Sequence, residues 1–487
     1  MVWGLMDEGM IHRSDGSKPG FEGKTLFVFP RTGAANRDLL RTELVQILKQ
    51  VPSLRIVIVS PLGKEPYFRE EFSSERVLVE PMPKSRVGFW ARRFRNFKLY
   101  LWSSRELTST IRVFRRSRFG RWRVLLWQDP IASLLRLAGI TEKEISDWEI
   151  RFFRCPEVSR LYDQYRPDAI LFSKFFSTDI GMVKEAKKRN IKTICLVQGW
   201  DTLTSKGYFS VIPDFLIVWN EVMKRDAIEF HGYPAEKIMP VGIPQFDHYW
   251  DVSRLMSRDE FFGLHRLDPR KKLITFATAS GGIAPEESEI IELFYQAMQK
   301  GRLGYPGQLL IRIHPNTSGG FLEALEALQG KPGIVMQRAG RTARIQDKWD
   351  PSREDMDLLA LTMYHSDVVI NAASTITLDA IAFDTPVIGV AFNLREQKNS
   401  YASYRHYYDF THFNRIVKSG GLRLAYSLDE LIHSVNQYLK DPSLDSEGRR
   451  RIREDHFYSM DGQSARRAAQ AVVREMGLNM DNKFLFC

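Results

Sequence analysis

Residues 366–392 read SDVVINAASTITLDAIAFDTPVIGVAF, and this stretch decides the fold class. The pattern predicts a buried strand that ends at Ala373, a short helix capped by Ser374 and Thr375, and a second buried strand after Pro386. Strands that alternate with helices form parallel sheets with helices on both faces. The free amides at the start of such a helix, together with its dipole and nearby hydroxyls, bind phosphate groups. The stretch therefore predicts an α/β fold with a phosphate site at this helix.

Asp379 lies four residues after Thr375, one turn further along the same helix face. A carboxylate in this position accepts hydrogen bonds from both hydroxyls of a ribose while the helix start holds a diphosphate. The alternative is structural: Ser374 caps the helix and Asp379 faces solvent. Strand, turn and capped helix are common in this order, so the stretch alone leaves both interpretations open.

A second polar rim is predicted at the end of the strand LLIRIHPN, residues 309–316. Side chains alternate along a strand, so Arg312 and His314 lie on the same side, next to Asn316. A cation and an imidazole at the carboxyl edge of a sheet suit a phosphate or a leaving-group oxygen. A lone histidine there is more often structural, but the predicted edge is shared with Ser374. We therefore assign Arg312 and Asn316 to donor binding and His314 to catalysis.

In the first half of the chain, the loop in LVQGWDTLTSKG, residues 196–207, follows an apolar strand. It carries more reactive groups than a connection needs, among them Gln198, Asp201 and Lys206. We assign Gln198 and Lys206 to the acceptor side. Trp200 and the glycines are equally consistent with a rigid structural turn.

The loop RTGAANRD, residues 31–38, has a single glycine and so lacks the GxGxxG pattern of a dinucleotide site. It still allows the backbone to approach a ligand closely before a helix begins. On this weaker signal we assign Gly33 and Asn36 to the acceptor side as well.

The alternation of strands and helices occurs twice. We expect an N-terminal extension at 1–23, a first parallel-sheet domain at 24–250, and a second at 265–487 that includes closing helices at 427–440 and about 462–476. The polar, turn-rich segment between the two predicts a linker. Because ligands bind at the carboxyl ends of strands in doubly wound sheets, we expect the site in a cleft between the domains.

The charge of the chain is concentrated in one segment. The formal net charge is +11, and residues 84–123 hold 13 basic residues, one acidic residue and nine aromatic residues. Within this basic insertion, Trp90, Phe94 and Phe97 share one face of a predicted helix with Leu101. Arg92, Arg93 and Arg95 lie among them in the sequence.

Three interpretations of the basic insertion remain open. Basic helices with Trp and Phe on their apolar side bind anionic membrane surfaces, and we assign Trp90, Phe94 and Phe97 with the three arginines 92, 93 and 95 to that role. A pair of surface helices whose aromatic residues are core is the structural alternative. A nucleic-acid surface has similar composition, but no nucleic-acid module is present elsewhere, so we expect no nucleic-acid partner.

Several other classes are excluded or disfavoured. The composition, 44% hydrophobic and 26% charged, is that of a globular protein. The apolar runs are too short for a membrane span, and the first residues lack a secretion signal. Three widely spaced cysteines suit neither a disulfide framework nor a zinc cluster, which favours a reducing cytoplasm. The common Walker, CxxC, HExxH and GxSxG signatures are missing, and we expect no metal site.

In their order along the chain, these segments resemble the GT-B superfamily of nucleotide-dependent transferases. The run STITLDAIAFDTPVI (374–388) resembles the donor-nucleotide motif of glycosyltransferases, UDP-N-acetylglucosamine 2-epimerases and CDP-glycerol glycerophosphotransferases. IRIHPN (311–316) is similar to the strand ending in His-Pro of the latter two families, and 457–476 looks like the closing Asp-Gly helix of the glycerophosphotransferases. The resemblance implies two Rossmann-like domains with parallel sheets facing a central cleft, a donor nucleotide held by the second domain, an acceptor held by the first, and no required metal or cofactor.

The chain departs from these families at two positions. Sugar-nucleotide members usually have Glu where this chain has Asp379, and the glycerophosphotransferases carry a His-Gly where Gln198-Gly199 stands here. Their proposed general base is therefore missing. Asp201 is the substitute candidate, since a carboxylate in a closed cleft has its pKa raised toward neutrality. A turn-forming role for Asp201 is the alternative.

Together these patterns predict a glycosyltransferase that moves a sugar from a nucleotide-activated donor to a hydroxyl acceptor, a polysaccharide or lipid-linked compound of the cell envelope. Transfer of a polyol phosphate from a CDP-linked donor, as in teichoic-acid synthesis, is the second hypothesis. A non-catalytic nucleotide-binding or membrane-associated protein is the third. We expect a cytoplasmic protein, peripheral at the inner face of the cell membrane.

Overall fold

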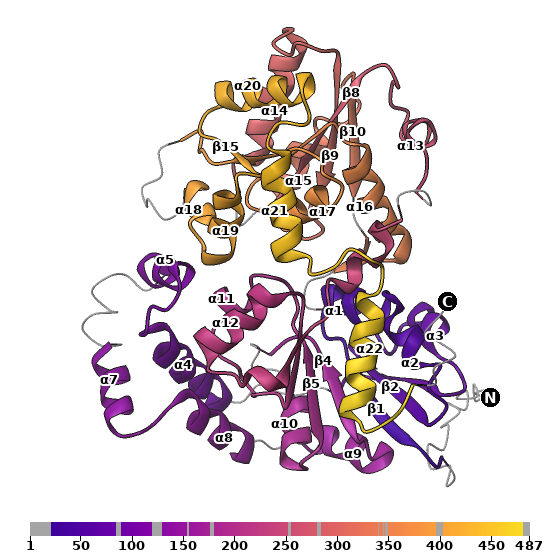
Figure 1. Cartoon of the computed structure of the whole chain (residues 1–487), viewed down its shortest axis with the longest axis vertical. Coiled ribbons are helices and arrows are strands. Elements are labelled where there is room, and N and C mark those ends of the chain that lie inside the picture. Colours follow the sequence, from indigo (N-terminus) through magenta and orange to yellow (C-terminus); the bar gives the residue numbers. More distant parts are fainter. Residues whose placement is uncertain are drawn as a thin grey trace, which may run out of the picture.

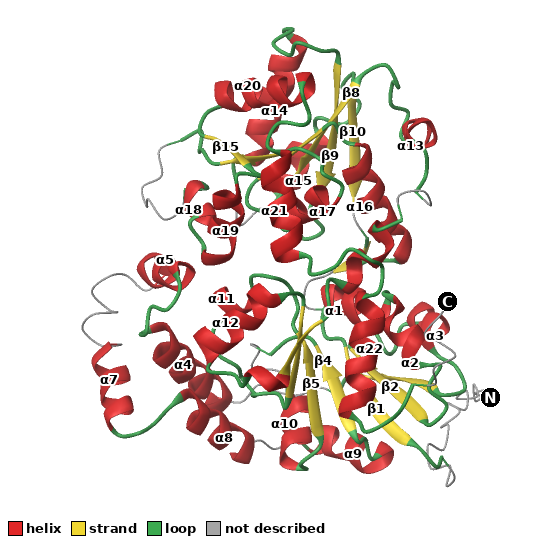
Figure 2. Cartoon of the chain, viewed as in Figure 1, coloured by secondary structure: helices red, strands yellow, loops and turns green. Residues whose placement is uncertain are grey.

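The computed structural model describes residues 21–83, 89–118, 129–152, 155–175, 180–251, 255–279, 284–338, 340–343, 345, 349–395 and 403–480. Most of the predicted extension 1–23 and parts of the basic insertion therefore lie outside the described residues. The chain forms two α/β domains, one above the other in Figure 1, and helices surround a sheet in each (Figure 2). No described helix combines the length and apolar character needed to cross a bilayer.

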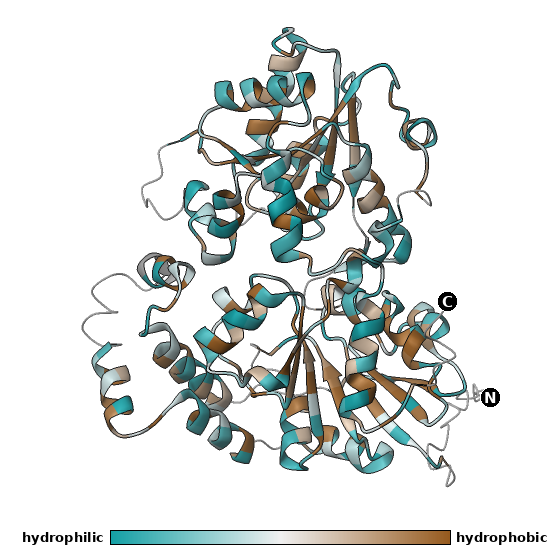
Figure 3. Cartoon of the chain, viewed as in Figure 1, coloured by the Kyte–Doolittle hydropathy of each residue, from teal (hydrophilic) through white to brown (hydrophobic). Residues whose placement is uncertain are grey.

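The first domain is built on a seven-stranded parallel sheet in the order β3-β2-β1-β4-β5-β6-β7. Its strands are β1 (Lys24–Phe29), β2 (Leu54–Ser60), β3 (Val77–Pro81), β4 (Ala169–Phe172), β5 (Lys192–Leu196), β6 (Phe215–Val218) and β7 (Ile238–Pro240). The four residues of β4 and of β6 are all buried, as expected of parallel strands covered on both faces. The central strand β4 is strongly hydrophobic in Figure 3.

The second domain has a six-stranded parallel sheet in the order β10-β9-β8-β13-β14-β15. Its strands are β8 (Lys272–Ala277), β9 (Gly307–Ile313), β10 (Ile334–Arg338), β13 (Val368–Asn371), β14 (Val387–Val390) and β15 (Arg423–Ala425). Both sheets reverse their strand order once, between β1 and β4 and between β8 and β13. These switch points are where doubly wound folds bind ligands, because the loops on the two sides diverge there.

Helices cover both sheets and form the basic insertion. The first domain contains α1 (Gly33–Leu40), α2 (Glu43–Leu48), α3 (Pro66–Phe72), α9 (Pro156–Tyr165), α10 (Gly181–Lys188), α11 (Thr202–Ser205), α12 (Glu221–His231) and the 3-10 turn η2 (Ala235–Lys237). The basic insertion and the segment after it contain α4 (Phe89–Ser103), α5 (Ser109–Arg118), α7 (Asp129–Leu137) and α8 (Glu142–Phe152).

The linker and the second domain supply the remaining helices. The linker holds η3 (Pro244–Tyr249) and α13 (Arg258–Leu264), and the domain holds α14 (Glu287–Gln299), α15 (Gly320–Glu326), α16 (Arg353–His365), α17 (Ile376–Ala382), α18 (Arg405–Tyr408), α19 (Thr411–Ser419), α20 (Leu428–Lys440) and α21 (Ser446–His456).

The last helix, α22 (Ser464–Glu475), returns to the first domain. Its alanine and valine side chains are part of the apolar core that includes Leu26 and Leu39, and Asp247 of the linker accepts hydrogen bonds from the amides of Ser464 (2.9 Å) and Ala465 (2.6 Å). The expected second domain ran to residue 487 and included this helix. That assignment is corrected, because the small apolar face of α22 is buried against the first sheet.

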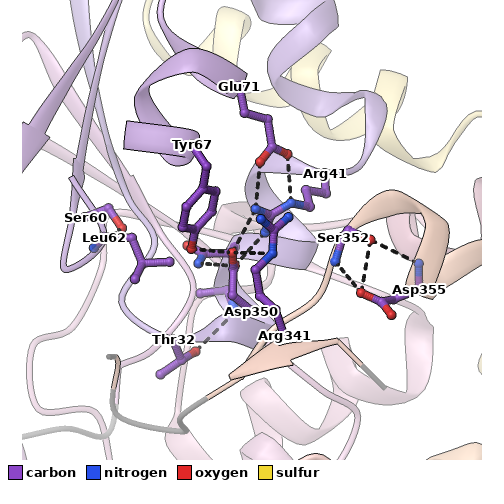
Figure 4. Close-up of polar contacts among 12 residues, drawn as sticks. Thr32, Arg41, Ser60, Leu62, Tyr67, Glu71, Arg341, Asp350, Ser352 and Asp355 are labelled. Atoms are coloured by element: carbon purple, nitrogen blue, oxygen red, sulfur yellow. Dashed lines mark hydrogen bonds and ion pairs between the residues drawn. The ribbon is translucent and has the colours of Figure 1, made fainter. Parts of the chain in front are cut away.

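A hairpin arm of the second domain crosses to the first. It consists of β11 (Arg341–Thr342) and β12 (Trp349–Asp350), and β12 packs on α1. The Asp350 side chain is 0% exposed and accepts hydrogen bonds from Arg41 (2.7 and 3.0 Å), Tyr67 (3.0 Å) and Asn36 (2.9 Å), all in the first domain (Figure 4). Four donors satisfy a carboxylate that is fully removed from water, so the contact fixes how the domains meet.

This contact can be compared with an exposed ion pair between the same domains. Asp350→Ala removes one of the two carboxylates that pair with the buried Arg41, whose other partner, Glu71 (2.9 Å), remains. The loss of this buried acceptor is expected to lower the free energy of unfolding by about 1–3 kcal/mol. Glu43→Ala removes the pair between Arg353 and Glu43 (2.6 Å), whose side chains are 55% and 46% exposed, and is expected to change stability by about 1 kcal/mol or less. Urea denaturation of both variants tests this. Equal effects would contradict the role given to Asp350.

Candidate functional site

The turn between β13 and α17 is held in an unusual backbone conformation. Ala373 has a φ of +46°, in the left-handed region that side chains other than glycine rarely adopt. Its amide donates to the hydroxyl of Tyr408 (3.0 Å), and the amide of Ser374 donates to the Oδ1 of Asn371 (3.0 Å). The backbone strain of about 1 kcal/mol is therefore offset by bonds that shape the turn. Strain of this kind is concentrated at functional sites.

The start of α17 points toward the first domain. Ser374 is half-buried and accepts a weak hydrogen bond from the amide of Ile376 (3.4 Å), whereas Thr375 is exposed. The indole Nε1 of Trp200, from the loop after β5, lies 3.4 Å from the Oγ1 of Thr375. The helix start and its hydroxyls thus lie at the gap between the domains, as expected for a phosphate site.

Asp379 lies where the linker and both domains converge. It is 6% exposed, and its Oδ1 accepts a hydrogen bond from Tyr249 of η3 (2.8 Å). Burial raises the pKa of Asp379, although Tyr249 and the guanidinium groups of Arg37 and Arg312 act in the opposite direction. The solvent-facing alternative for Asp379 is therefore wrong. The carboxylate is instead buried beside Tyr249 of the linker, with Arg37 of the first domain and Arg312 of the second acting on its pKa.

The strand-end residues of β9 have two different environments. Arg312 is buried and bonds to the Oε1 of Gln337, and burial lowers the pKa of Arg312 to about 10. Burial also lowers the pKa of His314 to about 4, so this imidazole is neutral at pH 7. Its Nδ1 accepts a hydrogen bond from the amide of Asn316 (3.1 Å), which places the ring proton on Nε2. His314 is therefore a neutral donor, and Asn316 is exposed beside it.

Asp201 does not have the properties expected of a general base. Burial alone would raise its pKa, but Lys206, His412 and Ser205 outweigh burial, and the pKa of Asp201 is lowered. The carboxylate is paired with Lys206 (3.0 Å) and accepts from the hydroxyl of Ser205 (3.0 Å). The expectation of a pKa raised toward neutrality was wrong, because Lys206 and Ser205 of its own loop and His412 of the other domain favour the ionised carboxylate.

The other residues assigned to the acceptor side divide into two pairs. Gln198 and Lys206 lie on the loop after β5, half-buried and exposed respectively. Gly33 and Asn36 contact the hairpin arm: a Cβ at Gly33 would lie 1.8 Å from the carbonyl oxygen of Trp349, and Asn36 bonds to Asp350. We therefore reassign Gly33 and Asn36 from the acceptor to the domain interface.

Sequence reasoning missed a buried acid beneath this site. Glu287 stands in an acidic run at the start of α14, but its side chain is fully buried and its Oε2 accepts a hydrogen bond from the amide of Ala279 (2.7 Å), just after β8. Its Oε1 has no protein partner, and the same holds for the Nδ2 of Asn371 at the end of β13. Because β8 and β13 are neighbours, both groups lie under the switch point. Nothing in an acidic run at a helix start distinguishes the one residue that turns inward.

Metal ligation has no candidate in the part of the chain that the structure describes. There, no three histidine, cysteine, aspartate or glutamate side chains are grouped so that they could hold an ion.

No family model matches this chain, and no curated protein matches it in sequence. Solved structures match over almost its whole length. S. aureus MnaA in a co-structure with UDP has a TM-score of 0.54 at 12% identity, covering 94% of this chain and 98% of that one. UDP-GlcNAc 2-epimerase from Neisseria meningitidis, bound to UDP-GlcNAc, has a TM-score of 0.53 at 12% identity, with 93% and 100% covered. The chain has the GT-B fold.

A glycosyltransferase from Rickettsia africae is a further match to the GT-B fold of this chain, with a TM-score of 0.50 at 11% identity and 93% and 99% covered. The prediction of two parallel-sheet domains in a GT-B arrangement is thus confirmed. The structure also brings Ser374, Thr375, Asp379, Arg312 and His314 to the carboxyl edge of the second sheet.

The buried Glu287 gives the stability of the GT-B domain a defined pH dependence. Burial raises the pKa of Glu287 to about 8 in the folded protein, above its value in the unfolded chain. The contribution of Glu287 to the free energy of unfolding is therefore complete below the unfolded pKa of about 4.3 and is lost as the pH rises through 8. Glu287→Gln is expected to become progressively more stable than the natural protein between pH 5 and pH 9. Melting temperatures across this range measure the effect.

Glu289→Gln is the matched control, because Glu289 lies on the same helix but is 47% exposed. If the difference in melting temperature between Glu287→Gln and the natural protein did not change with pH, the protonated state assigned to this carboxyl would be contradicted.

Proposed function

We propose that this protein is a glycosyltransferase that moves a sugar from a nucleotide-activated donor to a hydroxyl acceptor in the synthesis of a cell-surface polysaccharide or glycolipid. One observation carries the proposal: the start of α17 and His314 both follow the carboxyl ends of strands in the second sheet, and Trp200 of the loop after β5 contacts Thr375 at that helix start. Two structures with a similar fold were solved with UDP and with UDP-GlcNAc, which supports a nucleotide-activated donor for this chain. The donor is a substrate, and the proposal includes no resident cofactor or metal.

In this proposal each group has a chemical role. The amides and hydroxyls of Ser374 and Thr375 bind the diphosphate, and Asp379 accepts hydrogen bonds from the ribose hydroxyls. Arg312 contributes positive charge, and the Nε2 proton of neutral His314 is donated to an oxygen of the departing diphosphate. Preorganised donors at the leaving group lower the barrier because negative charge develops there in the transition state.

Transfer of a polyol phosphate from a CDP-linked donor is the second candidate. Asp379, shorter than the usual Glu, favours it, as does the closing Asp461-Gly462 turn, where Asp461 pairs with Arg467 (2.7 Å) and orders the start of α22. The nucleotide that binds distinguishes the two candidates.

Nucleotide binding is tested by thermal shift with UDP, GDP, CMP and CDP and with UDP-GlcNAc and CDP-glycerol. A ligand at 100 times its Kd is expected to stabilise the native state by about 2.7 kcal/mol. Stabilisation by uridine or guanosine compounds would favour glycosyl transfer, and stabilisation by cytidine compounds would favour polyol-phosphate transfer. If no compound stabilised the protein, both candidates would be contradicted.

Asp379→Ala is expected to weaken nucleotide affinity about 10- to 100-fold, because a charged hydrogen-bond acceptor for the ribose is lost. Asp429→Ala, in the same domain and 81% exposed, is the control. Unchanged affinity in Asp379→Ala, measured by titration calorimetry, would remove the ribose assignment.

We further propose that the enzyme binds an anionic membrane surface, where a lipid-linked acceptor resides. Exposed apolar side chains cluster on three helices that pack together, α4, α7 and α8. We name this set the apolar platform: Phe89, Trp90, Phe97, Leu134, Leu137, Trp148 and Phe152. Trp90 is 69% and Leu137 86% exposed, and Arg92, Arg93 and Arg95 are exposed on the same helix as Trp90. Apolar anchors beside cations are typical of interfacial helices.

The structure corrects part of the predicted membrane face. Leu101 is buried, and Phe94 packs with it in a small core between α4, α7 and α8. Lys98 is buried in an ion pair with Glu149 (2.5 Å). The structural interpretation therefore holds for the C-terminal half of α4, and the membrane proposal is restricted to its first turns and to the apolar platform.

Replacing Arg92, Arg93 and Arg95 together by Glu is expected to abolish most sedimentation with vesicles of anionic phospholipid, since each basic residue near such a surface contributes about 1 kcal/mol. The control carries the same charge change at Arg270, Lys300 and Arg302, which are exposed in the second domain. Equal sedimentation of the two variants would contradict membrane binding through α4.

A further inference from the structure

At one end of the gap between the two domains, three parts of the chain meet, and we call this place the junction. The hydroxyl of Thr108, just before α5 of the basic insertion, donates to the carbonyl oxygen of Thr204 in α11 (3.0 Å). The amide of Thr411, at the start of α19, donates to the hydroxyl of Thr110 (3.0 Å). The insertion, the first domain and the second domain therefore meet beside the loop that carries Asp201. An acceptor that comes from the apolar platform would reach the gap at this junction.

His412 lies inside the junction with its tautomer fixed. Its Nδ1 is 3.3 Å from the Oγ1 of Thr204, and that hydroxyl donates its proton to the carbonyl oxygen of Asp201 (3.1 Å). The oxygen of Thr204 must therefore accept from His412, so the ring proton is on Nδ1. Nε2 is left with a free lone pair, and no described residue donates a hydrogen bond to it. A third residue that orients the base in this way is the usual arrangement of catalytic histidines.

The position of His412 relates it to the donor site. Its ring packs edge-on against Trp200, with 4.9 Å between ring centroids, and the Nε1 of the same indole lies 3.4 Å from the Oγ1 of Thr375. One indole ring thus separates His412 from the helix start proposed to hold the diphosphate.

We propose that His412 is the general base that takes the proton from the acceptor hydroxyl. The proposal rests on the proposed function and replaces Asp201 in this role. The acceptor O–H proton moves to Nε2 of His412 as the acceptor oxygen forms a bond to the anomeric carbon. The bond from that carbon to the donor diphosphate breaks, and the diphosphate leaves with the electron pair. The imidazolium then releases its proton to solvent.

The charges around His412 are consistent with this cycle. Burial lowers the pKa of His412 to about 4, so the imidazole is unprotonated at neutral pH. Lys206, Arg415 and His456 also disfavour the protonated form, whereas Asp201 favours it. Asp201 is then a positioning residue, whose negative charge stabilises the imidazolium formed during transfer.

The test compares His412→Gln with His433→Gln, because His433 is an exposed histidine on α20. The donor is UDP-GlcNAc, whose sugar carries the anomeric carbon of the proposed step, glycerol supplies the acceptor hydroxyl, and release of UDP is followed. His412→Gln is expected to lower turnover about 100- to 1000-fold while its thermal shift with the donor stays unchanged. His433→Gln is expected to behave like the natural protein.

The outcomes separate the inference from the proposed function. If no donor stabilises the natural protein, the proposed function fails, and the role of His412 with it. If the donor binds and His412→Gln keeps turnover within threefold of His433→Gln, only the inference is overturned. A second measurement does not depend on turnover: nitrogen NMR at pH 7 is expected to show His412 protonated at Nδ1 alone. A proton on Nε2 would overturn the proposal.

Discussion

The burial of Asp350 is the constraint on which the rest of the structure depends. A carboxylate without exposed surface is stable only where charged and polar donors surround it, and here those donors are Arg41, Tyr67 and Asn36 of the other domain. The hairpin arm thereby holds the second domain at one position over the first. An open arrangement that separated these groups would have to rehydrate both charges, so the contact favours the closed gap.

The closed gap creates the electrostatics of the candidate site. Arg37 comes from α1, Tyr249 from the linker and Arg312 from β9, and all three act on the pKa of the one buried carboxylate, Asp379. Burial makes both His314 and His412 neutral, yet one is placed to donate a proton and the other to accept one. His314 has its proton on Nε2 because its Nδ1 accepts a backbone amide, and His412 has its proton on Nδ1 because a threonine oxygen accepts it. Neighbouring hydrogen bonds thus decide which histidine donates and which accepts.

Much of the fold could be predicted because its signals are local. Apolar runs bounded by turn residues located β9, β13 and β14, and the closing helices expected at 427–440 and about 462–476 are α20 and α22. The edge strands β3 and β15 and the strongly polar helix α21 were not predicted. Residues 36–50 are divided between α1 and α2, because Thr42 caps a second helix there. A cap residue inside an apolar pattern gives too weak a signal to mark a break.

The sequence by itself determined the two parallel sheets, the polar residues at their carboxyl edges and the concentration of positive charge in one insertion, because each depends on residues that are close together in the chain. Only the tertiary structure decided that α22 packs on the first domain, that Gly33 and Asn36 contact the arm, and that Asp201 is held ionised. These properties depend on burial and on pairing between residues far apart in the sequence. Neither can be calculated until the chain has brought such residues into contact.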